Sequence, residues 1–328
     1  MRQLQHIGRW LAAITLSAMS TAALAQGYPN KPVKIIVPFS AGGLTDVLAR
    51  GLGEELGRKW KQPVIVDNRP GANTIIGARL VADATPDGYT ILMANDPTLS
   101  ANQYLYSKLP YDPVNDFTPV INLVKTEQIL VTNKSSPYQT LENLVEAARK
   151  APGKISYGSY GVGSKAHLDT EAFAKLANVK FNHIPYKGVS DVVVGLLSKQ
   201  IDFGLTGISP VLEHIKSGGD LRALAISSPE RRTLFPDLPT FAEKGMPEFE
   251  SVAWFGLVVP RGTPQNVIDK IAADTSQILR RPEFEQRYVT GVGLELADQD
   301  PTAFASFLAK DRKQYEERIR AANVKLDY

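Results

Sequence analysis

Cysteine is absent from this chain of 328 residues, and histidine occurs only four times. Without cysteine there are no disulfide bonds, thiol nucleophiles, redox dithiols or thiolate metal sites. No His-Glu-x-x-His sequence occurs, and one of the four histidines lies within the first 25 residues, so little is left for a metal site. We therefore expect no metal and no other cofactor, and a fold that is held by its own hydrophobic core.

The sequence also has no cluster of lysine and arginine, and its charges nearly balance. Lysine and arginine together number 37 and the acids 34, which gives a formal charge of +3. Such a chain offers no electrostatic reason to bind nucleic acid. Beyond the N-terminal segment, no apolar run approaches the length that spans a bilayer, so we expect a soluble mature protein.

The N-terminal segment combines three features of a secretory signal. Arg2 and Arg9 precede an apolar run, Trp10–Met19, and the small-residue pattern Ala23-Leu24-Ala25 follows. The run is too short to span a membrane, and an N-terminal anchor or a buried helix is the alternative interpretation. We predict cleavage after Ala25, which removes two arginines and no acid and lowers the formal charge from +3 to +1.

The remaining chain is long enough for two lobes. Its apolar strands alternate with amphipathic helices, which is typical of an α/β fold with mainly parallel sheets. An extended run over residues 117–133 carries the chain to a second lobe, and the apolar stretch 251–260 returns it. We predict a first lobe from residues 26–125 and 251–328 and a second from 126–250, with the two crossings acting as hinges.

The periodicity of apolar residues predicts the individual elements. Strands are expected over residues 33–37, 64–68, 89–94, 155–157, 181–185, 201–206 and 221–227, and helices over 45–59, 75–84, 141–150, 164–177, 190–198, 209–216, 265–280 and 302–321. Residues 95–100 are expected to form a polar loop, and residues 231–250 an extended surface connection.

A glycine loop, residues 38–46, separates the first predicted strand from the first predicted helix. The N–H groups of a first helical turn lack intrahelical partners and carry partial positive charge, so they suit an anion. The adjacent Gly42 and Gly43 let the backbone approach a phosphate or carboxylate. A tight turn in an α/β core is the alternative. Asp46 is expected to support the helix start, because its carboxylate would repel an anionic ligand, and Asp202 is expected to support the site in a similar way.

A second glycine loop, residues 157–167, also follows a strand and opens a helix. It supplies free N–H groups, the Ser159 and Ser164 hydroxyls and the His167 imidazole, and Lys165 could add charge for an anion. The loop fits a dinucleotide fingerprint as well, but it lies in mid-chain and no strand-end acid follows about 20 residues on. We therefore reject a nicotinamide site.

A secreted hydrolase that uses His167 with Ser159 or Ser164 is the alternative function. Gly158 immediately precedes Ser159, so the spaced glycines of a nucleophile elbow are missing. We accordingly expect a binding protein and not an enzyme.

Five stretches of the sequence resemble, in the same order, the motifs of the Bug family, the periplasmic substrate-binding proteins of tripartite tricarboxylate transporters. The resemblance covers nearly the whole chain after the signal segment. The stretches are Val33–Asp46 with Ala49-Arg50, Asp67–Ala72, Pro86–Thr90, Tyr157–Ser159 with Gly163-Ser164 and His167-Leu168, and Trp254–Leu257 with Pro260–Pro264.

The resemblance implies a type II, Venus-flytrap-like fold of two lobes, with a small carboxylate held in the cleft by backbone groups and bridging water. It implies ligand contacts at Phe39, Ala41, Gly42 and Gly43 in one lobe and at Ser159, Gly163, Ser164 and His167 in the other, with Thr98 and Ser209 added by loop position. The family often carries a glycine pair where Asn73-Thr74 stand here, which places side chains at the rim of the cleft.

Together these features predict a periplasmic protein that binds one small organic acid. The acid is a mono- or dicarboxylate, aliphatic or aromatic, and the protein delivers it to the membrane subunits of a secondary transporter. We expect a monomer with no nucleic-acid partner.

Overall fold

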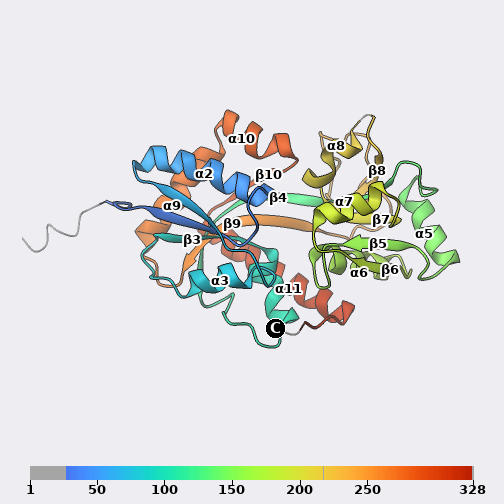
Figure 1. Ribbon diagram of the computed structural model, residues 1–328, viewed down its shortest axis with the longest axis horizontal. Coiled ribbons are helices and arrows are strands. Elements are labelled where there is room, and N and C mark those ends of the chain that lie inside the picture. The colour runs from blue at the N-terminus through green and yellow to red at the C-terminus, as the bar shows by residue number, and fades with distance from the viewer. Residues whose placement is uncertain (1–26, 217, 327–328) are drawn as a thin grey trace, which may run out of the picture.

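The structure is a computed structural model that describes residues 27–216 and 218–326. Figure 1 shows two α/β halves side by side, with strands β4 and β9 running between them. The predicted signal segment lies outside the described residues, so cleavage after Ala25 stays a prediction. In the described ranges, no helix combines the length and apolarity needed to cross a membrane.

The first half is assembled from both ends of the described chain. Its strands are β1 (Val33–Val37), β2 (Val64–Asn68), β3 (Thr90–Asn95), β9 (Val252–Pro260) and β10 (Glu295–Gln299), and its helices are α2 (Leu44–Trp60), α3 (Ile75–Ala82), η2 (Pro97–Ala101), α4 (Asn102–Leu105), α9 (Gln265–Leu279), α10 (Pro282–Tyr288), η4 (Thr290–Val292) and α11 (Pro301–Ala322).

The second half is formed by one continuous stretch of the chain. Its strands are β5 (Ser156–Ser159), β6 (Asn182–Pro185), β7 (Phe203–Gly207) and β8 (Leu221–Ile226), and its helices are α5 (Leu141–Lys150), α6 (Lys165–Leu176), α7 (Val189–Leu197), η3 (Ser209–Val211) and α8 (Leu212–Ile215).

A single curled sheet runs through both halves in the order β2-β1-β3-β9-β4-β7-β5-β6, with β8 and β10 also paired to β4. It is mixed: β1 with β2 and β3, and β5 with β6 and β7, are parallel, whereas every ladder of β4 and the ladder of β3 with β9 are antiparallel. Parallel pairs therefore predominate less than the sequence predicted. Strand β4 (Phe117–Asn133) is unbroken. Its residues up to Glu127 pair with β9, and those from Gln128 pair with β7.

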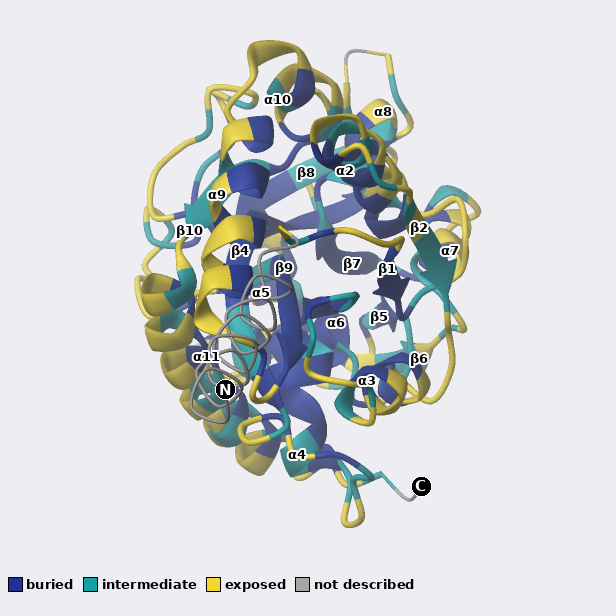
Figure 2. Cartoon of the chain, turned by 90° about the vertical axis from the view of Figure 1, so that its left-hand side faces the viewer, coloured by how far each residue is buried: buried dark blue, intermediate teal, exposed yellow. Residues whose placement is uncertain are grey.

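The cores follow from the amphipathic pattern of the helices. In α2, Leu48, Leu52 and Leu56 repeat every four residues, so they lie on one face, and each is at most 1% exposed. They pack with β1 in the core of the first half. Figure 2 shows this burial on the strands, with exposed residues on the outer faces of α9 and α11.

Helix α11 is fixed at both ends and touches both halves. Asp300 caps it by accepting a hydrogen bond from the Ala303 N–H at 2.8 Å, and Pro301 takes the first helical position. Asn323 ends it in the left-handed region with φ 51°. The helix packs on β4 and on α6 of the second half.

Several sequence expectations need correction. The polar loop predicted over 95–100 is mostly the π-helical turn η2, and the helix predicted over 209–216 breaks into η3 and α8. Helix α10 and strand β10 were not predicted. Residues 231–250 are a compact series of turns and not an extended connection, because Phe241 and Phe249 anchor them in the second core.

Candidate ligand-binding site

The first glycine loop joins β1 to the start of α2. Ala41, Gly42 and Gly43 are exposed and Phe39 is partly buried. Gly42 has a φ of 85°, which favours glycine. Gly43 is the N-cap of α2 and has no side chain to cap it. The loop therefore presents bare backbone at a helix start, which can accept an anion.

Asp46 lies beneath this loop and holds it together. Its Oδ2 accepts hydrogen bonds from the Gly42 N–H and from Arg50 Nε, both at 2.9 Å. Its Oδ1 accepts from Asn68 Nδ2 at 2.9 Å, and the same amide donates to the Phe39 carbonyl at 3.1 Å. Burial opposes ionisation, but the hydrogen bonds from Arg50, Gly42 and Asn68 outweigh it and lower the pKa of Asp46. The carboxylate is engaged by the protein itself.

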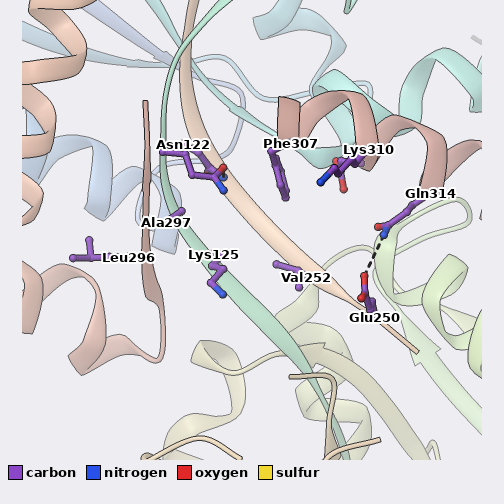
Figure 3. A pocket seen from close by; sticks show the side chains of 11 residues that line it. Asn122, Lys125, Glu250, Val252, Leu296, Ala297, Phe307, Lys310 and Gln314 are labelled. Carbon is purple, nitrogen blue, oxygen red and sulfur yellow. Dashed lines mark hydrogen bonds between the residues drawn. The ribbon is translucent and has the colours of Figure 1, made fainter. Parts of the chain in front are cut away.

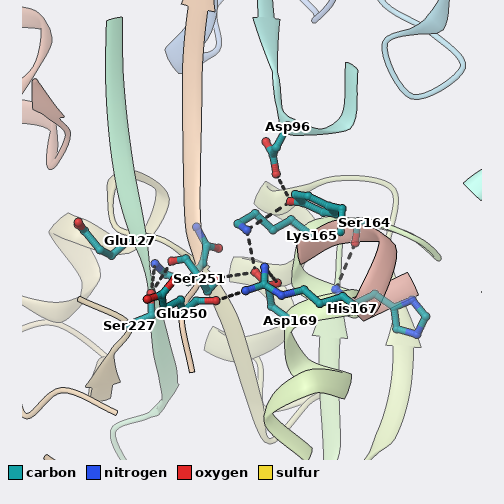
Figure 4. Close-up of polar contacts among 12 residues, drawn as sticks. Asp96, Glu127, Ser164, Lys165, His167, Asp169, Ser227, Glu250 and Ser251 are labelled. Carbon is teal, nitrogen blue, oxygen red and sulfur yellow. Dashed lines mark hydrogen bonds and ion pairs between the residues drawn. The ribbon is translucent and has the colours of Figure 1, made fainter. Parts of the chain in front are cut away.

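The second glycine loop is built on a similar plan. The N–H of Gly163, whose φ is 76°, donates to His167 Nδ1 at 3.1 Å. Ser164 caps α6 by accepting from the His167 N–H at 3.4 Å, as drawn in Figure 4. Ser159 Oγ accepts from the Gly161 N–H at 3.2 Å and donates to the Gly161 carbonyl at 3.0 Å.

Sequence reasoning missed a residue of β6 that contacts this loop, His183. Its Nε2 lies 2.6 Å from Ser159 Oγ, and its ring stacks on that of His167, with centroids 4.1 Å apart. Burial lowers the pKa of His167, and burial together with His167 lowers the pKa of His183 to about 4. Only the pairing of the strands could have indicated that His183 belongs to the site, because β6 places His183 beside Tyr157 of β5.

The second loop is more covered than the first. Gly163 is buried, and a Cβ placed on it would lie 3.0 Å from Leu326 and 3.2 Å from Leu105, which come from other parts of the chain. Val162 is 48% exposed. The accessible part of this loop is therefore its tip at Val162, the residue before Gly163.

The remaining predicted site residues have well-defined surroundings. Thr98 is wholly buried in a polar cluster, with its Oγ1 2.6 Å from Asn95 Oδ1 and 2.9 Å from Thr74 Oγ1. Ser209 begins η3, two residues after the last residue of β7. Asp202 accepts from the N–H and the hydroxyl of Ser156, both at 2.7 Å, and so joins neighbouring segments of the second half.

The turn that contains Asn73-Thr74 has an unusual backbone. Ala72, Asn73 and Thr74 have φ values of 45°, 49° and 76°, a region that favours glycine and disfavours a β-branched residue such as threonine. Asn73 and Asn102 secure the turn through hydrogen bonds of 2.7 and 2.8 Å. The chain therefore keeps the conformation of a glycine-rich turn but adds side chains.

A buried ionic network ties α6 to α11 (Figure 4). Lys165 Nζ lies 3.0 Å from Asp169 Oδ2, and Arg318 Nη1 lies 3.0 Å from Asp169 Oδ1. Tyr315 contacts Lys165 and donates to Asp96, whose pKa burial raises to about 6. The interpretation of Lys165 as a charge for an anion was wrong, because its side chain is 3% exposed and already paired.

A cavity of about 530 Å³ lies between β4, β9, β10 and α11 (Figure 3). Its lining includes Lys125 and Lys310 but also Glu250 and Asp311, so its charges balance. It contains none of the residues predicted to contact an acid. In the described part of the chain, no group of three or more His, Asp or Glu side chains could hold a metal ion.

Two α/β halves joined by crossing strands, each with a glycine loop at a helix start, are the arrangement of periplasmic substrate-binding proteins. A family model described as "Tripartite tricarboxylate transporter family receptor" matches residues 48–324. The chain belongs to this family.

Relatives agree with this assignment. Protein BugT of Bordetella pertussis (strain Tohama I) is 35% identical, over 99% of this chain and 98% of its own. The solved periplasmic binding protein BugD is 32% identical with a TM-score of 0.79, and covers 92% of this chain and 100% of its own. The R. palustris protein Rpa4515, solved with adipate, is 28% identical with a TM-score of 0.83, over the same shares.

These findings confirm the resemblance to the Bug family and the two-lobed periplasmic-binding-protein fold. The family and its solved relatives are substrate-binding proteins and not enzymes, so the hydrolase alternative has no support.

Proposed function

We propose that this protein captures a small organic carboxylate between its two halves and delivers it to the membrane subunits of a tripartite tricarboxylate-type transporter. The observation that carries the proposal is the matched pair of glycine loops, one at the carboxyl end of β1 and one at the carboxyl end of β5. Ligands of α/β sheets gather at such strand ends. The adipate held by the related R. palustris protein supports a carboxylate as the ligand class.

Backbone groups are sufficient for such an acid. Hydrogen bonds to a charged group contribute about 1.5–3 kcal/mol each, and a helix N-terminus adds about 0.3–1 kcal/mol. Micromolar affinity corresponds to about 8 kcal/mol, so about three to five such contacts suffice. The proposed contacts are Phe39, Ala41, Gly42 and Gly43 from the first loop, Gly163, Ser164 and His167 from the second, and Ser209. Ser159 and Thr98 are buried and their hydroxyls are already bonded within the protein, so they would reach the acid only after a rearrangement on closure.

We further propose that the halves are the lobes of a clamp. The first would comprise residues 26–125 and 251–328 and the second residues 126–250, because β4 exchanges its partner β9 for β7 between Glu127 and Gln128. Closure would bring the second set of contacts onto an acid already bound by the first. In this proposal the protein acts as a monomer in the periplasm, after its signal segment is cleaved following Ala25.

A thermal-shift screen of the exported chain tests the proposal. The panel contains adipate, succinate, malate, acetate and benzoate, with the matching amides as uncharged controls. A true ligand at about one hundred times its Kd adds about 2.7 kcal/mol to the free energy of unfolding and raises the melting temperature. The amides are expected to have no effect. A panel in which no acid raises the melting temperature, or in which acid and amide act alike, contradicts the proposal.

A further inference from the structure

The Ser159 hydroxyl has more partners than its place at the end of β5 requires. Its Oγ lies 3.2 Å from the Gly161 nitrogen, 3.0 Å from the Gly161 carbonyl oxygen and 2.6 Å from His183 Nε2. A hydroxyl donates one hydrogen bond and accepts two. All three contacts are satisfied together when the hydroxyl donates to the Gly161 carbonyl and accepts from the Gly161 N–H and from a proton on His183 Nε2.

The neighbouring imidazole has the same tautomer for a separate reason. His167 Nδ1 accepts from the Gly163 N–H at 3.1 Å, so the proton of the neutral ring is on Nε2. The two rings are nearly parallel, at 7°, and His183 also stacks on Tyr157 at a centroid distance of 4.9 Å. Tyr157 in turn donates to Glu171 of α6 at 2.7 Å. The rings form a column from the glycine loop to α6.

The groups around the column favour uncharged imidazoles. Two stacked rings 4.1 Å apart would repel each other if both were protonated. Glu171, the carboxylate next to the column, is engaged by the Tyr157 hydroxyl. The Lys165–Asp169 pair on the same helix is satisfied within the buried network. The column therefore acts through hydrogen bonds and stacking and not through charge.

We propose that His183 is a positioning residue that acts through Ser159 and, with His167, sets the second glycine loop in the conformation that receives the ligand. Gly161 and Gly163 both lie in the left-handed region, with φ of 125° and 76°, and each is held by one histidine, directly or through Ser159. Asn68 supports the first loop in the same way, by donating to the Phe39 carbonyl. It comes from β2, the parallel neighbour of β1, just as His183 comes from β6, the parallel neighbour of β5.

Imidazole NMR of the ligand-free chain tests the hydrogen-bond arrangement without any ligand. The exported chain contains three histidines, at positions 167, 183 and 214, so histidine labelled with ¹⁵N gives a spectrum that is simple to assign. We expect the Nε2–H tautomer for His167 and His183, with His214 as the reference. An Nδ1–H tautomer at His183, or averaging between its two tautomers, overturns the proposal.

Two substitutions separate the hydrogen bond from the stack. His183→Phe keeps a ring but loses the bond to Ser159, whereas His183→Gln can place an amide N–H near Ser159 but loses the ring. We expect His183→Phe to weaken adipate binding about tenfold in calorimetry and His183→Gln to stay within about threefold of the wild type. Equal losses in both variants, or wild-type affinity in His183→Phe, overturn the proposal, and His214→Phe is the control.

This inference rests on the proposed function but can fail independently of it. If the wild type binds no acid, the proposed function fails. The NMR chemical shifts of the Gly161 and Gly163 amides then test whether His183 positions the loop. Those two signals should move in His183→Phe and stay in place in His183→Gln. Unmoved signals in both variants would show that His183 does not set the loop.

Discussion

The two glycine loops hold the same backbone arrangement by different chemistry. In each, a glycine with positive φ donates its N–H to a side chain four residues later, Gly42 to Asp46 and Gly163 to His167. The first acceptor is an ionised carboxylate held by Arg50, and the second is an uncharged imidazole within a stack. The shared geometry shows that the loop conformation is the common requirement, and that either a charge or a neutral ring can meet it.

The loops differ also in exposure. Gly42 and Gly43 face solvent, whereas Gly163 is covered by Leu105 and Leu326. The backbone at the first helix start is therefore the more accessible of the two.

The most direct way to break this comparison is to block the exposed loop. In Gly43→Val the backbone fits, because φ is −77°, and the new Cβ would lie 3.8 Å from its nearest neighbour, the Ser40 carbonyl oxygen. We expect the side chain to cover the helix start and abolish acid binding in calorimetry, with a melting temperature close to that of the wild type. Gly188→Val, at the equally open N-cap of α7, is the matched control and should bind normally. Unchanged affinity in Gly43→Val would make the loop only a turn.

Removing the charge beneath the first loop should cost stability. In Asp46→Ala, the Gly42 N–H, the Asn68 amide and Arg50 lose their common acceptor. Hydrogen bonds to charged groups contribute about 1.5–3 kcal/mol, so we expect the free energy of unfolding in urea to fall by about 2–3 kcal/mol. Asp46→Asn keeps an oxygen and should fall by less. An Asp46→Asn variant as stable as the wild type would show that the charge is unimportant.

The parallel between Asn68 and His183 can be sharpened by removing the Asn68 amide. Asn68→Ala deletes its hydrogen bonds to Asp46 and Phe39 but leaves the other donors of Asp46 in place. We expect a loss of about 1 kcal/mol in the free energy of unfolding and a smaller loss of affinity than His183→Phe gives. A larger loss of affinity would mean that the first loop depends more on its neighbouring strand than the second does.

The two loops should also lose their stabilising contacts at different pH. The folded-state pKa of His183 is about 4, below the unfolded value of about 6.5, so the unfolded state binds more protons and stability falls as pH drops from about 6.5 toward 4. The pKa of Asp46 is lowered from 3.8, so its contribution is lost only in more acidic solution.

The contribution of His183 can be isolated by measuring the free energy of unfolding in urea for the wild type and His183→Gln between pH 7 and 4.5. Asp96, with a pKa raised to about 6, acts in the opposite sense but is common to both proteins. The advantage of the wild type should shrink as pH falls. A constant difference would show that His183 has the same pKa in both states.

The first loop could be predicted from the sequence because its determinants are local. A glycine pair lies between a strand and a helix, and Asp46 follows Gly42 by one helical turn. The strands 33–37 and 64–68 were predicted at their observed limits for the same reason.

The supports of the second loop were hidden because their partners are distant in the sequence. His183 is 24 residues from Ser159, and Lys165 is 150 residues from Tyr315. A pattern of apolar residues also says nothing about a short helix such as α10, which is stabilised by packing of Phe284 in the first core. Tertiary contacts, and not local preference, decide these features.

Strand β4 has a mechanical consequence for the proposed clamp. It passes from one half to the other without a break and is paired with β9 right up to the point where the partners change. Rotation of one half against the other must then be distributed as twist along the paired strands β4 and β9. It cannot be concentrated at a single flexible residue. Closing of the proposed clamp would therefore change the twist of β4 and β9 together.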